Sequence, residues 1–357
     1  MRQPLIVGLG RSGAGLHLHV LRNLARDPRD ARTPPLWTGP VIAVDPRPDA
    51  AAGLPPGQVT LTGTLDAACS LLGPAPAVVH VCTPPATRRT VLEELAVRGF
   101  QDLVVEKPLA ADATELAAIE RLRLRYGLRI AVVAPWLAAE LTHRLRLLIA
   151  SGRLGRLRAL RVAQHKPRFL RSLRPDDGHP TAFDVEMPHS LGLVLDLAGP
   201  ARPTGAAVTD LRCGPEVRPR MGSARLDLCH TGGVSTRVVS DLAAPVRERS
   251  VTLTFERGVA VAHYPLSDAD DHAQLIVGDG PPEVFRDDAL LAFLRRTYTR
   301  FAATPPGGAR ARDDFALHAD VVRLLDQAKR HCAGRAGEPR GGGDDLNTKE
   351  RTADVRV

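Results

Sequence analysis

The segment PLIVGLGRSG, residues 4–13, carries the strongest local signal in the chain. A short apolar run leads at once into the pattern G-x-G-x-x-G. In such a turn the first glycine permits a tight bend, the second lets a diphosphate approach the backbone, and the third lets a helix pack closely on the strand. We therefore expect this loop to bind a dinucleotide through Gly8, Gly10, Arg11, Ser12 and Gly13. Taken alone, the pattern also fits a glycine-rich turn with no ligand.

The residues around this loop alternate between apolar runs and amphipathic stretches. Strands are predicted at residues 4–8, 40–45, 58–62, 77–82, 102–106 and 129–133. Helices are predicted at 14–26, 87–98 and 112–126. Continuously apolar strands separated by helices are typical of a parallel sheet covered on both faces. Residues 1–133 are therefore expected to form a doubly wound α/β domain of the Rossmann type.

The pattern changes after Pro135. A helix predicted at 137–151 is followed by strands without regular helices between them, at 157–165, 234–240, 250–255, 259–264 and 274–277. This succession predicts an α+β domain with a large, mostly antiparallel sheet over residues 134–332, closed by helices at 287–303 and 313–332. Residues 333–357 are almost free of apolar side chains and are expected to be a disordered tail.

The net charge of +8 comes from 48 Lys and Arg against 40 Asp and Glu, and only four of the 48 are lysines. A basic chain invites a nucleic-acid interpretation. Here, however, the arginines are scattered among acidic residues, and aromatic side chains make up 4% of the chain, so bases would find few stacking platforms. We therefore expect no nucleic-acid partner.

The five cysteines are widely spaced and form no C-x-x-C pair, which favours reduced thiols in a cytoplasmic protein. The histidines form no H-x-x-x-H or H-E-x-x-H pattern, so we expect no metal site. The apolar run at the N-terminus is too short for a signal peptide, and no stretch is long enough to cross a membrane.

Asp45 ends the second predicted strand. A carboxylate at this place can accept a hydrogen bond from a ribose 2′-hydroxyl and would repel a 2′-phosphate, which favours NAD as the cofactor. Arg47 could instead bind a 2′-phosphate, so NADP stays open. Asp45 lies 32 positions after Gly13, whereas the usual spacing is about 20.

Two more segments follow predicted strands. Thr83 and Pro84 come after the fourth strand, and Glu106-Lys107-Pro108 comes after the fifth. An isolated E-K-P could be a solvated turn. Ligands of an open parallel sheet bind outside the carboxyl ends of its strands, however, and Lys107 is one of only four lysines. We therefore place Thr83, Pro84, Glu106 and Lys107 at the dinucleotide site.

Taken together, these motifs resemble the glucose-fructose oxidoreductase / inositol dehydrogenase (Gfo/Idh/MocA) family over about residues 4–330. The resemblance rests on the G-x-G-x-x-G loop, CTPPAT at 82–87, E-K-P, GRLG at 152–155, and a helix that carries His189 and ends at Gly199. It implies an NAD(P)-dependent oxidoreductase that acts on a secondary alcohol or ketone of a sugar, amino sugar or cyclitol. It also implies a homo-oligomer, a dimer or a tetramer, and often a cis peptide before the proline of E-K-P.

The chemistry of such a reaction explains the residue types. Removing hydride from a secondary alcohol requires a base for the hydroxyl proton and a donor to the developing carbonyl oxygen. Imidazole titrates near neutrality, and an ammonium group can donate to the oxygen. The resemblance assigns these tasks to His189 and Lys107, both of which would also contact the substrate.

The chain departs from the family pattern next to His189. The family usually has aspartates where this chain has Val185 and Gly192. Residues three or four apart share a helix face, so Glu186 is the first candidate for the missing carboxylate and Asp184 is the second. Pro188 favours a helix that starts near it, which would leave both acids on the entering loop. The missing aspartates also motivate an alternative function, a dinucleotide-binding sensor or scaffold without catalysis.

Four further side chains are uncertain contacts. The family usually has a histidine where this chain has Arg88, which we interpret as an ordinary charge on a helix surface. Trp136 is a candidate substrate contact, although core packing is the commoner role of a tryptophan. Lys166 and Arg168 could bind an anionic group of the substrate, or they could lie on a solvated loop.

Overall fold

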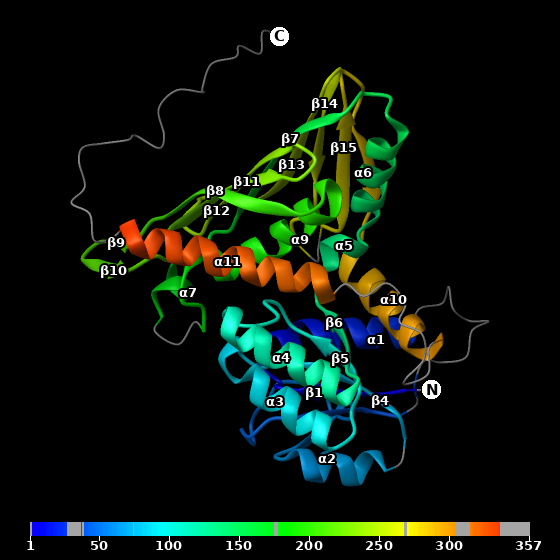
Figure 1. Cartoon of the computed structure of the whole chain (residues 1–357). Coiled ribbons are helices and arrows are strands. Elements are labelled where there is room, and N and C mark those ends of the chain that lie inside the picture. The colour runs from blue at the N-terminus through cyan, green and yellow to red at the C-terminus, as the bar shows by residue number, and fades with distance from the viewer. Residues whose placement is uncertain are drawn as a thin grey trace.

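The computed structural model describes residues 2–26, 37, 39–73, 75–174, 178–267, 270–303 and 315–335. Two sheets organise this part of the chain (Figure 1). A six-stranded sheet with its helices forms the lower half of the view, and an eight-stranded sheet forms the upper half. Helix α11 (Phe315–Arg335) runs between the two halves.

The six-stranded sheet is parallel throughout, with strand order β3-β2-β1-β4-β5-β6. Its strands are β1 (Gln3–Val7), β2 (Val41–Val44), β3 (Val59–Thr62), β4 (Ala77–Val81), β5 (Asp102–Val105) and β6 (Arg129–Val132). The order reverses between β1 and β4, which is the point where a doubly wound sheet binds its ligands. The predicted Rossmann fold is therefore confirmed.

Helices cover both faces of this sheet. Leu5 and Val7 pack in a cluster with α2 (Leu65–Leu72), α3 (Pro85–Val97) and α4 (Ala113–Tyr126). Ile6 packs on the opposite face with the π-helical segment η1 (Gly13–Leu18), α1 (His19–Arg26) and α10 (Ala289–Ala303). Thus α10, which comes late in the chain, completes the core behind the glycine-rich loop. Helix α2 was not predicted.

The eight-stranded sheet has the order β16-β15-β14-β13-β7-β12-β11-β8. Its strands are β7 (Leu157–His165), β8 (Ala201–Val208), β11 (Ser223–His230), β12 (Ser235–Asp241), β13 (Glu248–Phe255), β14 (Gly258–His263), β15 (His272–Val277) and β16 (Glu283–Arg286). Strands β7 and β12 are parallel, and the other neighbouring pairs are antiparallel. The predicted α+β class is confirmed, although β8, β11, β16 and the small pair β9 (Leu211–Cys213) and β10 (Glu216–Arg218) were missed.

Of the remaining helices, α5 (Pro135–Ala138) and α6 (Glu140–Ser151) precede β7 in the chain, and α7 (Phe169–Leu173), α8 (Ala182–Val185) and α9 (Met187–Ala198) follow it. The single helix predicted at 137–151 is divided at Ala139, whose backbone is extended with φ −61° and ψ 141°. Helix α11 continues to Arg335, beyond the predicted end at Cys332. Residues 336–357 of the expected tail lie outside the described residues.

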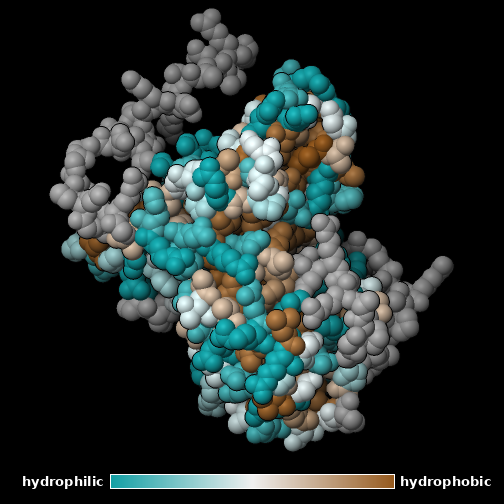
Figure 2. Space-filling model, viewed as in Figure 1, coloured by the Kyte–Doolittle hydropathy of each residue, from teal (hydrophilic) through white to brown (hydrophobic). Residues whose placement is uncertain are grey.

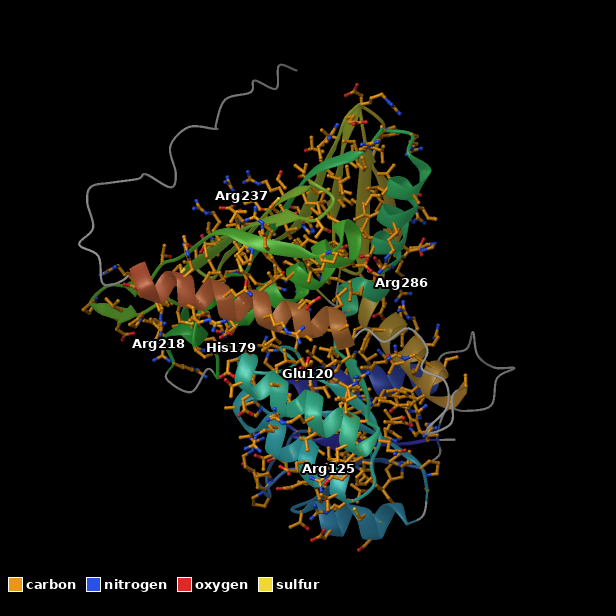
Figure 3. All side chains as sticks on the ribbon, viewed as in Figure 1. Glu120, Arg125, His179, Arg218, Arg237 and Arg286 are labelled. Carbon is orange, nitrogen blue, oxygen red and sulfur yellow. The ribbon has the colours of Figure 1, made fainter. Side chains whose placement is uncertain are left out.

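Helix α11 connects the two halves by contacts in both directions. Phe315, Ala319 and Val322 belong to the core of the parallel sheet, whereas Val321 and Leu325 belong to the core of the eight-stranded sheet. Figure 3 shows Glu120 on α4 facing α11, where its Oε1 atom lies 2.6 Å from Nη2 of Arg323. Helix α11 therefore packs against both halves and joins them through apolar contacts and an ion pair.

The surface carries much of the charge in ion pairs. On the outer side of the eight-stranded sheet, Arg237, labelled in Figure 3, pairs with Asp227 at 2.8 Å, and Arg225 pairs with the same carboxylate at 3.3 Å. On the face seen in Figure 2, hydrophilic side chains predominate and hydrophobic ones appear between them in separate groups. In the part of the chain that the structure describes, no helix has the length and apolar character needed to span a bilayer.

Gly13 gives a test of the packing at the start of the first helix. A Cβ atom at Gly13 would lie 2.0 Å from the carbonyl oxygen of Gly8, whereas one at Gly15 would have no neighbour within 4 Å. We expect Gly13→Ala to lower the free energy of unfolding by about 1–3 kcal/mol. Gly15→Ala should keep or raise it, because alanine leaves the unfolded chain fewer conformations than glycine does. Urea unfolding measures both. Equal stability of the two variants would contradict this packing.

Candidate functional site

The glycine-rich loop has the geometry of a phosphate cradle. Gly8 has φ +92°, and Gly13 lies against the Gly8 carbonyl oxygen, so these two glycines hold the bend. No atom lies within 4 Å of a Cβ built on Gly10, which leaves this side of the loop open to a ligand. Arg11 is exposed and Ser12 is half-buried just before η1. The residues present therefore fit a bound diphosphate.

The Asp45 carboxylate is tied to the same loop. Its Oδ2 atom accepts the backbone N–H of Leu9 at 2.8 Å. Arg47 forms a two-pronged pair with it, from Nε to Oδ1 at 2.9 Å and from Nη2 to Oδ2 at 3.0 Å. Hydrogen bonds from Arg47 lower the pKa of Asp45, so the carboxylate is charged at neutral pH. An acid and an exposed guanidinium thus stand side by side at the end of β2.

Thr83 and Pro84 lie at the carboxyl end of β4, beside the loop. A Cβ atom on Gly8 would come within 3.3 Å of the Thr83 backbone nitrogen, so the two turns are in close contact. The Thr83 hydroxyl is buried, and no residue that the structure describes hydrogen-bonds it. Pro84 is exposed and immediately precedes α3. The hydroxyl therefore keeps an unused hydrogen-bonding capacity beside the cradle.

Arg88 is not a surface charge, so that interpretation was wrong. Its side chain is 1% exposed and bridges two loops. Nη2 donates to the Thr83 carbonyl at 2.7 Å, and Nη1 donates to the Pro108 carbonyl. Burial lowers the pKa of Arg88 to about 10, and the group stays charged at neutral pH. Arginine is common in this stretch, so residue type alone could not predict that Arg88 of α3 faces the sheet rather than solvent.

Glu106 and Lys107 follow β5, and the peptide from Lys107 to Pro108 is cis, as the family resemblance implies. Glu106 is buried, and its Oε2 atom accepts the Lys107 N–H at 3.1 Å. The Lys107 ammonium reaches across to the Val185 carbonyl, which it contacts at 2.5 Å. Lys107 therefore joins the parallel-sheet half of the molecule to the segment between α8 and α9.

Glu186 lies at the junction of α8 and α9 in a polar cluster. Its carboxylate accepts hydrogen bonds from Lys166 at 2.5 Å and from Gln164 at 2.6 Å, and Gln164 in turn accepts one from Ser190 at 2.7 Å. Burial alone would raise the pKa of Glu186, but the charges of Lys166 and Lys107 lower it to about 2. Burial lowers the pKa of Lys166 in spite of this ion pair.

His189 faces the same cluster from the first turn of α9. Burial, aided by the charge of Lys107, lowers the pKa of His189 to about 3, so the imidazole is neutral near pH 7. Its Nδ1 atom is buried, and no described residue hydrogen-bonds it. Lys107, Glu186 and His189 act electrostatically on one another, so the structure brings these three predicted residues together.

Asp184, the second candidate carboxylate, has a different surrounding. It belongs to α8 rather than to a loop, and its Oδ2 atom accepts the N–H and hydroxyl of Thr181. Its Oδ1 atom accepts a hydrogen bond from Lys329 of α11 at 2.8 Å. Helix α9 begins at Met187, one residue before Pro188. Asp184 thus caps a short helix and holds α11, whereas Glu186 faces Lys107 and His189.

Trp136 and Arg168, two predicted substrate contacts, are both buried. The Trp136 ring stacks on Tyr264 with centroids 4.3 Å apart, and it also lies 6.4 Å from the His189 ring. Trp136 is therefore mainly a wall that supports His189. The Arg168 backbone N–H donates to the Leu242 carbonyl at 3.1 Å at the start of α7.

Three more polar residues lie behind the site and were not predicted. His17, His80 and Tyr298 form a buried chain that ends on Glu106. The available signal was the position of His17, four residues after Gly13, in a helix that must pack on the sheet. Among the described residues, no cluster of three or more His, Cys, Asp or Glu side chains could hold a metal ion.

Comparisons with known proteins add solved structures of the same fold. No protein-family model matches the chain, and no curated protein matches it in sequence. The 3-ketoreductase KijD10 from Actinomadura kijaniata, solved with NADP and TDP-benzene, superposes with a TM-score of 0.75 at 14% identity, over 93% of this chain and 98% of that one. A proposed NADPH-dependent oxidoreductase from Desulfitobacterium hafniense gives 0.74 at 12% identity, over 94% and 96%. A proposed oxidoreductase from Magnetospirillum magnetotacticum gives 0.68 at 20%, over 91% and 98%. The chain has the fold of these proteins along nearly its whole length.

Arg88 and its neighbour Arg89 provide a matched pair for testing the bridge between the two loops. Arg88→Ala leaves two carbonyl groups without their charged donor and opens a cavity, so we expect the free energy of unfolding to fall by about 3 kcal/mol. Arg89 is 41% exposed and pairs with Glu93 and Glu115 at the surface. Arg89→Ala should change stability by less than about 1 kcal/mol. Similar losses in urea unfolding would contradict the role of Arg88.

His189 predicts a pH dependence of stability. With its folded pKa near 3 and its ordinary value at 6.5, the unfolded chain binds a proton that the folded chain does not. The free energy of unfolding therefore falls as the pH drops below 6.5. Between about pH 7 and pH 5, above the range of most carboxyl groups, His189→Gln should make this slope shallower. The exposed His143→Gln controls for the loss of a histidine, and an unchanged slope in His189→Gln would show that the imidazole is not held neutral.

Proposed function

We propose that the protein is an NAD(P)-dependent oxidoreductase, of the Gfo/Idh/MocA kind that the sequence resembles, acting on a secondary alcohol or ketone of a sugar, amino sugar or cyclitol. The observation that carries this proposal is the contact of Lys107 Nζ with the Val185 carbonyl at 2.5 Å. It brings the lysine at the carboxyl end of β5 to the segment that holds Glu186 and His189. This contact supports a site in which a dinucleotide cradle, an ammonium donor and a neutral imidazole lie together.

The cofactor proposal rests on the fit of the cradle. Gly8, Gly10, Arg11, Ser12 and Gly13 would hold the diphosphate, with Thr83 and Pro84 bordering it and Glu106 supporting Lys107. When bound, nicotinamide supplies or accepts the hydride. Asp45 suits the ribose hydroxyls, and the exposed Arg47 beside it suits a 2′-phosphate. The NADP bound by the 3-ketoreductase of the same fold supports the phosphorylated form for this chain.

The proton can be handled by two side chains. In ketone reduction, the Lys107 ammonium donates a hydrogen bond to the carbonyl oxygen and then a proton to the alkoxide that develops there. In the reverse direction the same path is retraced: the uncharged Lys107 amine takes the hydroxyl proton as hydride leaves for nicotinamide, and the neutral His189 receives that proton from Lys107 at its unpartnered Nδ1 atom. The Glu186 carboxylate, anchored by Lys166 and Gln164, stabilises the positive charge that His189 then carries.

The substrate side of the proposed site is polar, and several cationic side chains act on it. Lys107, Lys166 and Arg249 all act electrostatically on the Glu186–His189 region, and Arg168 lies near the end of β7. Hydroxyl-rich substrates offer hydrogen-bond partners to such side chains, and Trp136 gives the wall behind them. The 3-ketoreductase named above was solved with a nucleotide-linked ligand, TDP-benzene, which supports a sugar-type substrate. A homo-oligomer, dimer or tetramer, is part of this proposal.

Lys107→Ala separates the cofactor role from the chemical role. We expect the variant to bind NADPH with an affinity within about threefold of the wild-type chain, because the glycine loop and Asp45 stay in place. Turnover with a sugar or cyclitol ketone found by screening should fall by about 10²–10⁴. Calorimetry and absorbance at 340 nm measure the two quantities.

The possible outcomes separate the candidate functions. If the wild-type chain binds neither NADPH nor NADH, the proposal fails. If it binds one of them but reduces no ketone across phosphorylated sugars, free sugars, amino sugars and inositols, the sensor or scaffold alternative of the same fold replaces the enzyme. If turnover survives in Lys107→Ala, the lysine has no part in the mechanism.

A further inference from the structure

A chain of four buried side chains runs behind the glycine-rich loop. Glu106 Oε1 lies 3.0 Å from His17 Nε2, His17 Nδ1 lies 2.7 Å from His80 Nδ1, and His80 Nε2 lies 2.9 Å from the Tyr298 hydroxyl. The four residues come from the end of β5, from η1, from β4 and from α10. Each is at most 7% exposed, so the chain of side chains is shielded from bulk solvent.

The contacts and the charges together assign the protons. Glu106 can only accept, so His17 donates to it from Nε2, and one proton lies between the two Nδ1 atoms, which are 2.7 Å apart. Burial alone would lower the pKa of His17, but Cys82 and Glu106 raise it to about 10. Burial and the charge of His17 lower the pKa of His80 well below its ordinary value, so His80 is neutral. It accepts at Nδ1 and donates to Tyr298 from Nε2.

The Glu106 carboxylate links the His17 side chain to the backbone of Lys107. One carboxylate oxygen accepts from His17, and the other accepts the backbone N–H of Lys107 at 3.1 Å. A carboxylate is rigid and planar, so the direction in which Oε1 is held also sets the direction of Oε2. The opposite side of the turn is held by Arg88 through the Pro108 carbonyl. The backbone of Lys107 is thus fixed from both sides by buried cations.

The local sequence explains how His17 reaches this position. The first helix opens with a π-helical segment, Gly13–Leu18, whose wider turn changes which side chains face the sheet. His17 is fully buried, while Gly15 and Leu16 on the same segment are exposed. The segment follows directly after the loop that would hold the diphosphate. It therefore connects that loop mechanically to Glu106.

We propose that His17 is a positioning residue, which holds the Glu106 carboxylate so that the Lys107 backbone, and with it the ammonium group, stays aligned with the dinucleotide cradle. The inference rests on the proposed function only for the chemical role of Lys107. The alignment itself is a property of the chain and can be measured without substrate or cofactor.

The scarcity of lysine makes this measurement practical. The chain has four lysines, so reductive methylation with ¹³C-formaldehyde gives at most four side-chain signals besides that of the N-terminus, and Lys107→Arg assigns one of them. In His17→Gln we expect the Lys107 signal to move, while the signals of Lys166 and Lys329 stay at their wild-type positions. In Tyr298→Phe, which removes the far end of the chain without touching Glu106, all signals should stay in place.

A purely structural role predicts a different pattern, in which His17→Gln and Tyr298→Phe both lose stability and neither moves the Lys107 signal. That result, or equal movement in both variants, would overturn the proposal. If His17→Gln does not fold, His80→Leu takes its place, because it removes the acceptor of His17 Nδ1 and should move the Lys107 signal in the same direction by less. An unmoved signal there also overturns the proposal.

Turnover gives an independent readout once a substrate is known. His17→Gln should lower kcat by about ten- to a hundredfold and leave the KM for NADPH within about threefold, because the misalignment affects the reacting group and not the diphosphate cradle. An unchanged kcat would overturn the positioning role. Absence of any turnover in the wild-type chain would count against the proposed function, while the signal of Lys107 would still decide the role of His17.

Discussion

A buried carboxylate is stable only when cations and donors surround it, and Glu106 has them from several elements at once. His17 and the Lys107 N–H each hydrogen-bond it, and Arg88 acts on it electrostatically, while burial alone would raise its pKa. With these partners the pKa of Glu106 falls to about 2. Because the same partners hold the glycine-loop helix and the turn after β5, the candidate site depends on this one charge.

The second half of the site is fixed by another charge of the same kind. Glu186 is held by Lys166 and Gln164 from β7 and lies close enough to Lys107 and His189 to influence both. Two buried carboxylates, one in each half of the molecule, thus interact electrostatically with the Lys107 ammonium. The neutral state of His189 follows from its burial beside that ammonium, which is the state required for accepting a proton.

The sequence allowed much of this to be predicted where the signal is local. The G-x-G-x-x-G loop and the apolar runs at 4–8 and 77–82 predict the parallel sheet, because glycine spacing and strand burial follow directly from residue type. Strand β8 was missed because ARPTGAAV mixes Pro, Gly and Arg with small apolar residues, and β11 was missed because SARLDLCH alternates polar and apolar residues and contains no continuous apolar run. The burial of Arg88 and His17 was missed because it depends on which side of a helix meets the sheet. For His17, the π-helical segment also shifts that side.

The proposed function requires a dinucleotide in the glycine cradle with its nicotinamide ring next to Lys107 and His189. A crystal structure of the wild-type chain grown with NADP⁺ is the decisive test. We expect the diphosphate over Gly10 and the nicotinamide C4 atom facing a space bounded by Lys107 Nζ and His189 Nδ1, with reacting atoms able to approach to about 3–3.5 Å. A nicotinamide ring bound away from Lys107, or a cradle left empty at saturating NADP⁺ and NAD⁺, would contradict it.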